Sequence, residues 1–348
     1  MKAITKQVIT TKPISEKTIV IIGASSGIGR ATALEFAKKG STLILVARRE
    51  GVLNDLAAEC LASGSKQAIA VKADVTDAKT LENVVATALK ESATIDVWIN
   101  NVGAGAVGEL NEIPLEVHEQ IIRTSLIGHL NGTYAILPVF KKQGYGVLIN
   151  TISLGAWVPE PYAVAYTASK YGLRGLSESL RCELIHWPGI AVCDVYPAYI
   201  DTPGFQHGAN YTGKKLKPMP PVFPAERVAR TMVKLASHPR NTVPVGETAL
   251  AFKWMHAVCP SLTRRVVTGI MDNYFKRAKN APISNGHVFE STPLGSAVSG
   301  GWISKEQKAT VPIAVGALVA GVLTYFLVKS KGHGWAAKEP VAAAGRVS

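Results

Sequence analysis

The stretch TIVIIGASSGIG, residues 18–29, decides the fold. Its first five residues are apolar or β-branched, as is typical of a strand buried inside a parallel sheet. Gly23, Gly27 and Gly29 follow at the spacing of a turn whose backbone comes close to a phosphate before a helix begins. The stretch therefore predicts a strand, a phosphate-binding turn and a helix, which together make the first unit of a dinucleotide-binding sheet.

The alternation of strands and helices continues along the chain. Short apolar runs predict further strands at 42–47, 68–72, 97–99, 146–150, 191–196 and 243–245. Helical patterns lie between them at 30–39, 51–62, 81–90, 115–137 and 166–181. Repeated strand–helix units predict an α/β fold with a Rossmann-type, doubly wound parallel sheet, which binds ligands beyond the carboxyl ends of its strands.

The composition divides the chain into five parts. We expect an N-terminal extension at 1–17, a single catalytic domain at 18–281, a linker at 282–310, an apolar segment at 311–328 and a basic tail at 329–348. Within the catalytic domain, residues 201–224 are rich in Pro, Gly and Lys and have no periodicity. A stretch of this kind is either a lid over a substrate site or a disordered loop, and we favour a lid because it follows a strand end.

The segment 311–328 contains no charged residue. Its length is at the lower limit for a membrane span, and a buried terminal helix is the alternative. Because the segment is apolar all round and follows a flexible stretch, we expect membrane association, with the catalytic domain facing the cytoplasm. The basic residues of 329–348 favour a cytoplasmic location for this tail. A single span would instead place the tail and the catalytic domain on opposite sides of the membrane. The orientation of the segment therefore stays open.

The charge and composition of the chain exclude several classes of protein. The 348 residues are 47% hydrophobic and 18% charged, which excludes a globally disordered chain. The formal net charge is +13 at pH 7, but the basic residues are dispersed and no nucleic-acid-binding motif accompanies them. We therefore expect affinity for anionic lipid or a phosphorylated cofactor and none for nucleic acid. His118, His129 and His186 lack the spacing of metal ligands, so no metal site is expected.

Two arginines follow the second expected strand, Arg48 and Arg49. In dinucleotide-binding sheets, an acidic residue near this place accepts hydrogen bonds from a ribose 2′-hydroxyl, whereas an arginine accommodates a 2′-phosphate. The planar guanidinium group suits phosphate because it donates several parallel hydrogen bonds. The arginines therefore predict NADP(H) rather than NAD(H), the alternative being that Arg48 only caps a solvated turn.

Ser153, Tyr166 and Lys170 form the second informative pattern. Tyr166 and Lys170 are four residues apart and share one face of the expected helix. A lysine cation beside a phenol stabilises the phenolate, which predicts a lowered pKa for Tyr166. Ser153 follows an expected strand and can hydrogen-bond a substrate oxygen. The pattern indicates proton transfer at a carbon–oxygen centre, although Tyr-x-x-x-Lys pairs also occur by chance on amphipathic helices.

On these residues, positions 18–250 resemble the short-chain dehydrogenase/reductase family. The family's glycine turn reads T-G-x-x-x-G-x-G, and Ile22 replaces its threonine. N-N-V-G at 100–103 resembles the family's N-N-A-G, and P-A-Y-I-D-T at 197–202 resembles its P-G motif. The resemblance implies cofactor binding by Gly23, Ser25, Ser26, Gly27, Ile28, Gly29, Arg48, Arg49, Asp74, Val75, Asn101, Tyr166, Lys170, Pro197, Ile200 and Thr202.

The resemblance also implies roles for the catalytic residues. Tyr166 would be the general acid in reduction and the base in oxidation, Ser153 would orient the substrate oxygen, and Lys170 would bind the nicotinamide ribose. Ser125 stands where the family usually carries an asparagine that supports a water in the proton relay. Since serine is shorter and has one donor, we expect a weakened relay rather than lost activity.

The sequence thus predicts an NADP(H)-dependent oxidoreductase that interconverts a small-molecule carbonyl and an alcohol. The apolar residues 156–159 and the apolar segment 311–328 favour an apolar substrate, although a broad-specificity aldehyde or ketone reductase fits about as well. A membrane-tethered NADPH-binding scaffold without turnover is the alternative, favoured only by Ser125. Family members commonly form dimers or tetramers, which implies a homo-oligomer.

Overall fold

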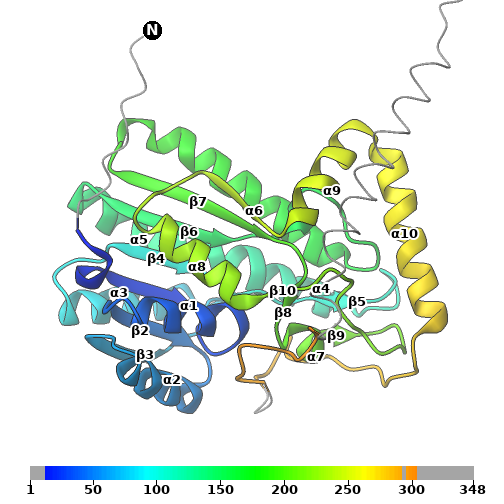
Figure 1. Ribbon diagram of the computed structural model, residues 1–348, viewed down its shortest axis with the longest axis horizontal. Coiled ribbons are helices and arrows are strands. Elements are labelled where there is room, and N and C mark those ends of the chain that lie inside the picture. Colours follow the sequence, from blue (N-terminus) through cyan, green and yellow to red (C-terminus); the bar gives the residue numbers. More distant parts are fainter. Residues whose placement is uncertain (1–11, 292–294, 304–348) are drawn as a thin grey trace, which may run out of the picture.

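A seven-stranded sheet forms the centre of the computed structural model, which describes residues 12–291 and 295–303 (Figure 1). The strand order is β11-β7-β6-β4-β1-β2-β3, and every neighbouring pair is parallel. The predicted doubly wound parallel sheet is confirmed. The strands are β1 Thr18–Ile22, β2 Thr42–Ala47, β3 Gln67–Lys72, β4 Val97–Asn100, β6 Gly146–Thr151, β7 Ile190–Pro197 and β11 Thr242–Val245.

Helices cover both faces of the sheet. Successive side chains of a strand point to opposite faces, so Ile19 and Ile21 of β1 enter one core cluster while Val20 and Ile22 enter another. The first cluster includes residues of α1 Gly27–Ala37, α2 Glu50–Ala62 and α8 Ala225–Leu235. The second includes residues of α3 Ala78–Glu91, α5 Gly128–Gln143 and α6 Val164–Glu183. Burial on both faces explains why the strands are continuously apolar.

The helix expected at 115–137 is interrupted. It consists of α4 Leu115–Ile122, a π-helical turn η2 Arg123–Ile127, and α5, which continues to Gln143. Ser125 lies in this turn, and its Oγ atom hydrogen-bonds the backbone of Ala104 in the loop after β4. Turns of this kind often occur at functional sites.

The stretch 201–224, expected to be a lid, contains short elements that pack on the domain. Two small parallel pairs tie it down, β8 with β10 and β5 with β9. Beyond it, two helices form a hairpin beside the sheet (Figure 1). The remaining elements are η1 Ile14–Glu16, β5 Ala106–Val107, η3 Leu154–Ala156, η4 Leu184–His186, β8 Ile200–Asp201, α7 Gly204–His207, β9 Ala209–Asn210, β10 Phe223–Pro224, α9 Glu247–Val258 and α10 Pro260–Arg277.

Residues 285–291 and 295–303, drawn in orange in Figure 1, form a segment that we call the C-terminal strap. Its composition predicts a linker, but the strap packs against the catalytic domain. The Asp201 carboxylate accepts hydrogen bonds from Ser299 Oγ at 2.7 Å, Gly300 N at 2.9 Å and Trp302 N at 3.0 Å. Val288 of the strap is buried. The described part of the expected linker is therefore part of the folded domain.

The apolar segment 311–328 and the basic tail 329–348 lie outside the described residues, as does most of the N-terminal extension. In residues 12–291 and 295–303, no helix combines the length and the apolar character needed to cross a membrane.

Candidate active site

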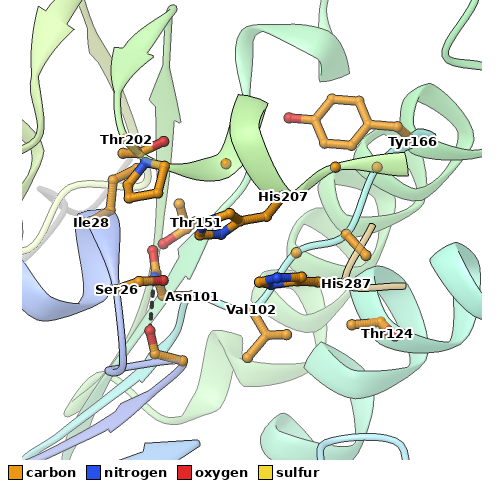
Figure 2. A pocket seen from close by; sticks show the side chains of 18 of the residues that line it. Ser26, Ile28, Asn101, Val102, Thr124, Thr151, Tyr166, Thr202, His207 and His287 are labelled. Atoms are coloured by element: carbon orange, nitrogen blue, oxygen red, sulfur yellow. Dashed lines mark hydrogen bonds between the residues drawn. The ribbon is translucent and has the colours of Figure 1, made fainter. Parts of the chain in front are cut away.

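A cleft of about 470 Å³ opens at the carboxyl ends of the central strands. Its walls include the last residues of β1, β2, β6 and β7, which are Ile22, Ala47, Thr151 and Pro197. Of the site residues expected from the sequence, all except Gly29 and Ser125 line this cleft. They come together because parallel strands end at one edge of the sheet. Figure 2 shows Ser26, Asn101, Thr202 and Tyr166 around the same pocket.

The glycine turn between β1 and α1 has a conformation that depends on its glycines. Gly23 and Gly27 have left-handed φ angles of +85° and +52°. A side chain at Gly29 would begin 2.0 Å from the carbonyl oxygen of Gly23, so only glycine allows this approach of helix to strand. Gly29 therefore packs behind the turn instead of lining the cleft. Because α1 begins at Gly27, the positive end of its dipole lies at the cleft, where it favours an anion.

Ser153, Tyr166 and Lys170 lie together in the cleft. Ser153 follows β6, and its Oγ atom accepts a hydrogen bond from Gly155 N at 3.0 Å. Tyr166 and Lys170 lie one turn apart on α6, with Lys170 Nζ 5.5 Å from the centre of the Tyr166 ring. Lys170 Nζ donates to the carbonyl oxygen of Thr151 at 3.1 Å, and the residue is buried. The arrangement can therefore hold an oxygen atom beside a phenol and a serine hydroxyl.

The electrostatics of Tyr166 differ from the expectation. Burial, followed by the nearby Glu160 carboxylate, raises the pKa of Tyr166 above its usual range, and the polar Ser153 side chain opposes the rise. Burial lowers the pKa of Lys170 to about 8, against an opposing effect of Glu160. The expected lowering of the Tyr166 pKa is therefore wrong for this structure, because desolvation and a negative neighbour outweigh any stabilisation of the phenolate.

Glu160 is the residue that reasoning from the sequence missed. Its Oε1 atom, the Tyr166 Cε1 atom and the Ser153 Oγ atom lie 2.9, 3.3 and 3.4 Å from the point where a side chain at Gly155 would begin. Burial raises the pKa of Glu160 to about 7, with Lys170 opposing. The available signal was an acidic residue inside the apolar loop between Ser153 and Tyr166. The site therefore contains a titratable carboxyl group beside the phenol.

Ser125 lies behind the cleft wall rather than in it. Its Oγ atom accepts a hydrogen bond from Ala104 N at 3.0 Å and donates to Ala104 O at 3.2 Å. The side chain is buried. The single hydroxyl donor of Ser125 is therefore used to hold the loop after β4.

Arg48 and Arg49 lie at the cleft, as expected from their position after β2. Arg48 donates to the backbone carbonyls of Phe289 at 3.1 Å and His287 at 3.3 Å, both in the C-terminal strap. Arg49 donates to Ser25 Oγ at 3.2 Å and to the strap carbonyl of Gly295 at 3.5 Å. The two guanidinium groups therefore join the strap to the glycine turn.

The strap also contacts the turn and the far side of the cleft directly. The amide of Gly27 donates to the carbonyl of Ala297 at 3.0 Å, and Trp302 Nε1 donates to the carbonyl of Thr202 at 2.9 Å. His287 and Val288 of the strap line the cleft. The strap thus forms one wall of the cleft, which the sequence did not indicate.

Asp74 and Val75, which the family resemblance gives as cofactor-binding residues, lie at the cleft after β3. The Asp74 carboxylate accepts hydrogen bonds from the amide of Thr76 at 2.9 Å and from its hydroxyl at 2.8 Å. These bonds fix the turn that carries Val75. In the described part of the chain, no group of three or more His, Cys, Asp or Glu side chains has the arrangement of a metal site.

A second cavity of about 420 Å³ adjoins the cleft. Both are lined by Leu154, Glu160 and Tyr199. The other walls of the second cavity come from the loop after η3, from the lid and from α9 and α10, and they are largely apolar. These walls include Val158, Met219, Phe252, Val267 and Ile270. An apolar chamber thus lies next to Ser153 and Tyr166.

Comparison with known proteins gives a consistent result. The family model for short chain dehydrogenase matches residues 17–210. An uncharacterized oxidoreductase of Bacillus subtilis, YxnA, is 32% identical over 335 residues, covering 91% of this chain and 92% of that protein. The mouse dehydrogenase/reductase SDR family member 7 is 34% identical over 194 residues, covering 54% of this chain and 57% of that protein.

Solved structures agree with these sequence relatives. An alcohol dehydrogenase of Thermococcus sibiricus complexed with 5-hydroxy-NADP has a TM-score of 0.57 at 27% identity, covering 66% of this chain and 95% of that chain. A short-chain dehydrogenase/reductase of Burkholderia phymatum in complex with NAD has a TM-score of 0.63 at 22% identity, covering 79% and 100%, and supports the fold alone. The chain therefore belongs to the short-chain dehydrogenase/reductase family, and it is an oxidoreductase of the type that binds a nicotinamide cofactor.

Proposed function

We propose that this oxidoreductase uses NADP(H) to interconvert a carbonyl and an alcohol, with Tyr166 as the general acid and base. The observation that carries the proposal is that Ser153, Tyr166 and Lys170 lie in the same cleft as the glycine turn. Neither the glycine turn nor the Ser153, Tyr166 and Lys170 set alone indicates this reaction. Together they supply an anion site and a proton donor within one cavity. The Tyr166 substitution described in the Discussion tests this proposal.

The residues of the cleft suit NADP(H). The glycine turn leaves room for backbone to approach a diphosphate, and Arg48 and Arg49 provide guanidinium donors for a 2′-phosphate. The solved relatives include one complex with a modified NADP and one with NAD, so the preference rests on the two arginines of this chain.

In this mechanism, the bound nicotinamide supplies a hydride to the carbonyl carbon in reduction and accepts it in oxidation. Tyr166 donates its hydroxyl proton to the carbonyl oxygen in reduction and takes the proton of the alcohol in oxidation. Ser153 hydrogen-bonds the same oxygen and holds it near the phenol. The ammonium group of Lys170 uses one N–H on Thr151 and keeps others for the hydroxyls of the ribose.

The apolar cavity beside the cleft supports an apolar substrate. In a series of methyl ketones of increasing chain length, we expect kcat/KM to rise by up to about fourfold per methylene until the cavity is filled. The reason is that burying a methylene group contributes about 0.8 kcal/mol. Steady-state kinetics with NADPH would measure the series. A value that stays flat with chain length would remove this cavity from the substrate site.

Glu160 supports a specific dependence of the reaction on pH. Its carboxylate disfavours the phenolate, so Glu160→Gln is expected to lower the Tyr166 pKa and to move the pH profile of alcohol oxidation to lower pH. An inflection near pH 7 from Glu160 itself should disappear. The kcat/KM of oxidation, measured from pH 5 to 10, checks both effects.

The control for this prediction is Glu178→Gln on α6, because Glu178 is exposed and pairs with Arg174 on the outer face of the helix. Its pH profile should match that of the unchanged protein. Identical profiles for the Glu160 and Glu178 variants would argue against an effect of Glu160 on the phenol.

Membrane association through 311–328 and a homo-oligomeric state are further parts of the proposal, and both rest on the sequence. Cutting the chain after residue 304 is expected to move the protein from the membrane fraction to the soluble fraction, since the apolar segment is then lost. Fractionation of cells that express either form measures this. Full-length protein found already in the soluble fraction would contradict the anchor.

One observation favours the alternative of an NADPH-binding scaffold with weak turnover. The Ser125 hydroxyl, which stands in place of the relay asparagine, is engaged with Ala104 on both its donor and acceptor sides. Tight cofactor binding with no turnover on a broad panel of carbonyls would support this alternative.

A further inference from the structure

Two histidines from separate segments meet inside the cofactor cleft. His207 ends α7 in the lid, and His287 belongs to the C-terminal strap. Their rings stack with centroids 4.3 Å apart and planes inclined by 22°. Figure 2 shows both imidazoles in the pocket, between the Ser26 and Asn101 side and the Thr124 and Val102 side.

The backbone fixes this pair in place. The amide of His287 donates to the carbonyl of His207 at 2.8 Å. A side chain at Gly295 would begin 1.7 Å from Cε1 of His207, so the strap also passes against that ring at Gly295. Gly286 has a φ of +52°, and a side chain there would begin 2.1 Å from the His207 carbonyl oxygen. The strap therefore encloses the His207 ring through positions that require glycine.

The surroundings of the pair are positively charged. Burial, His207, Arg49 and Arg48, in that order, lower the pKa of His287 to about 4. Burial and Arg49 lower the pKa of His207. The two acidic residues that line the described cleft are engaged elsewhere, Asp74 with Thr76 and Glu160 beside Tyr166. Both imidazoles are thus neutral at pH 7. The positive charge around them comes from Arg48 and Arg49.

The two arginines and two histidines at this end of the cavity fit an anion. A phosphate group offers several acceptor oxygens and a charge near −2 at pH 7, which suits guanidinium and imidazolium donors. The N-terminal end of α1 lies at the same cavity, and the helix dipole favours an anion there. An apolar or neutral ligand would leave these charges uncompensated.

We propose that His207 and His287 are phosphate-binding residues of the cofactor cleft, and that they take up a proton when the phosphate binds. The inference rests on the proposed function, since it takes a phosphorylated dinucleotide as the ligand. It extends the site beyond the glycine turn and the arginines to the lid and the strap.

The sign of the proton exchange follows from the charges. Without the anion, burial and the arginines keep the imidazoles neutral; a phosphate beside them favours the charged form and raises their pKa. The imidazoles therefore take up protons when the cofactor binds, at pH values between their pKa in the free protein and their pKa in the complex. The affinity for the cofactor accordingly rises as the pH falls through the bound pKa.

Isothermal titration of the full-length protein with NADPH tests the inference. At about pH 7, where a phosphate monoester is already mostly ionised, we run the titration in two buffers with different ionisation enthalpies. A net uptake of a substantial fraction of a proton is expected in the unchanged protein. His287→Asn and His207→Asn should each reduce this uptake and weaken NADPH binding by roughly tenfold, as for one charge-assisted hydrogen bond. The exposed His238→Asn serves as the matched control and should change neither quantity.

Titrations with NADH and with 2′-AMP show whether the histidine pair binds the 2′-phosphate or the diphosphate of the cofactor. Uptake with NADPH and 2′-AMP but not with NADH assigns the pair to the 2′-phosphate, whereas uptake with both dinucleotides assigns it to the diphosphate. NADPH binding with no buffer-dependent enthalpy in the unchanged protein would overturn the inference and leave the proposed function standing. No binding of either dinucleotide would instead overturn the proposed function.

Discussion

Replacing Tyr166 with phenylalanine is expected to lower kcat about 10³-fold while leaving the affinity for NADPH nearly unchanged. The variant keeps the ring and loses only the hydroxyl that donates and accepts the proton, and general acid–base catalysis contributes about 10² to 10⁴ in rate. Turnover would be followed by NADPH absorbance with the best ketone of the methyl ketone series. Cofactor affinity would be measured separately by NADPH fluorescence.

Tyr171→Phe is the matched control for this substitution. Tyr171 lies on the same helix, and its hydroxyl donates to the carbonyl of Trp157 at 3.0 Å, outside the cleft. Its loss should leave kcat within a few-fold of the unchanged protein. Equal rates for the Tyr166 variant and the unchanged protein would exclude the phenol as the acid, and absent turnover in all forms with intact NADPH binding would favour the scaffold.

Replacing Arg48 with aspartate is expected to shift the preference between NADPH and NADH by roughly 100-fold toward NADH. The change removes charge-assisted hydrogen bonds to a 2′-phosphate, worth about 1.5–3 kcal/mol each. It also introduces a carboxylate that repels the phosphate and can accept hydrogen bonds from a 2′-hydroxyl. The ratio of kcat/KM for the two cofactors gives the selectivity directly.

Because Arg48 also holds the C-terminal strap, a second variant must separate the two effects. Asp201→Asn weakens the other attachment of the strap, at Ser299, Gly300 and Trp302, without touching Arg48. We expect it to change the affinity for both cofactors in parallel. An equal shift in selectivity for both variants would mean that the strap, rather than a bond from Arg48 to phosphate, decides the preference.

The sheet could be predicted because its signals are local. β1 is a run of β-branched and apolar residues directly before a glycine turn, and the conformation of that turn depends on Gly23 and Gly27 themselves. Tyr166 and Lys170 could likewise be predicted as a pair, because four residues make about one turn of a helix. Their meeting with Ser153 follows from the topology, since β6 ends at the same edge of the sheet as β1.

The environment of Tyr166 could not be predicted in the same way. A single acidic residue in a loop is usually solvated, and the burial of Glu160 depends on the path of the chain past Gly155. The place of Ser125 behind the cleft similarly involves a contact with Ala104, twenty-one residues away. Both features change the chemistry of the site, but neither leaves a periodic pattern in the sequence.

The strap is the feature furthest from prediction. Arg48 and Phe289 are 241 positions apart, and the group that accepts the hydrogen bond is a backbone carbonyl. Every residue carries such a carbonyl, so the side chains of the strap do not predict the contact. Glycine and serine there indicate a linker, yet Gly286 and Gly295 are needed for close approach to His207.

The family model matches residues 17–210, but the pocket is completed by residues beyond 285. A shortened protein trimmed to residues 17–210, or stopped at residue 281, would retain every motif residue and still lack an outer wall. Assays on such a fragment would measure binding and activity in a cleft that is open to solvent on one side and has altered charge. Expression boundaries for this protein should therefore be chosen from three-dimensional contacts, with the C-terminal limit no earlier than residue 303.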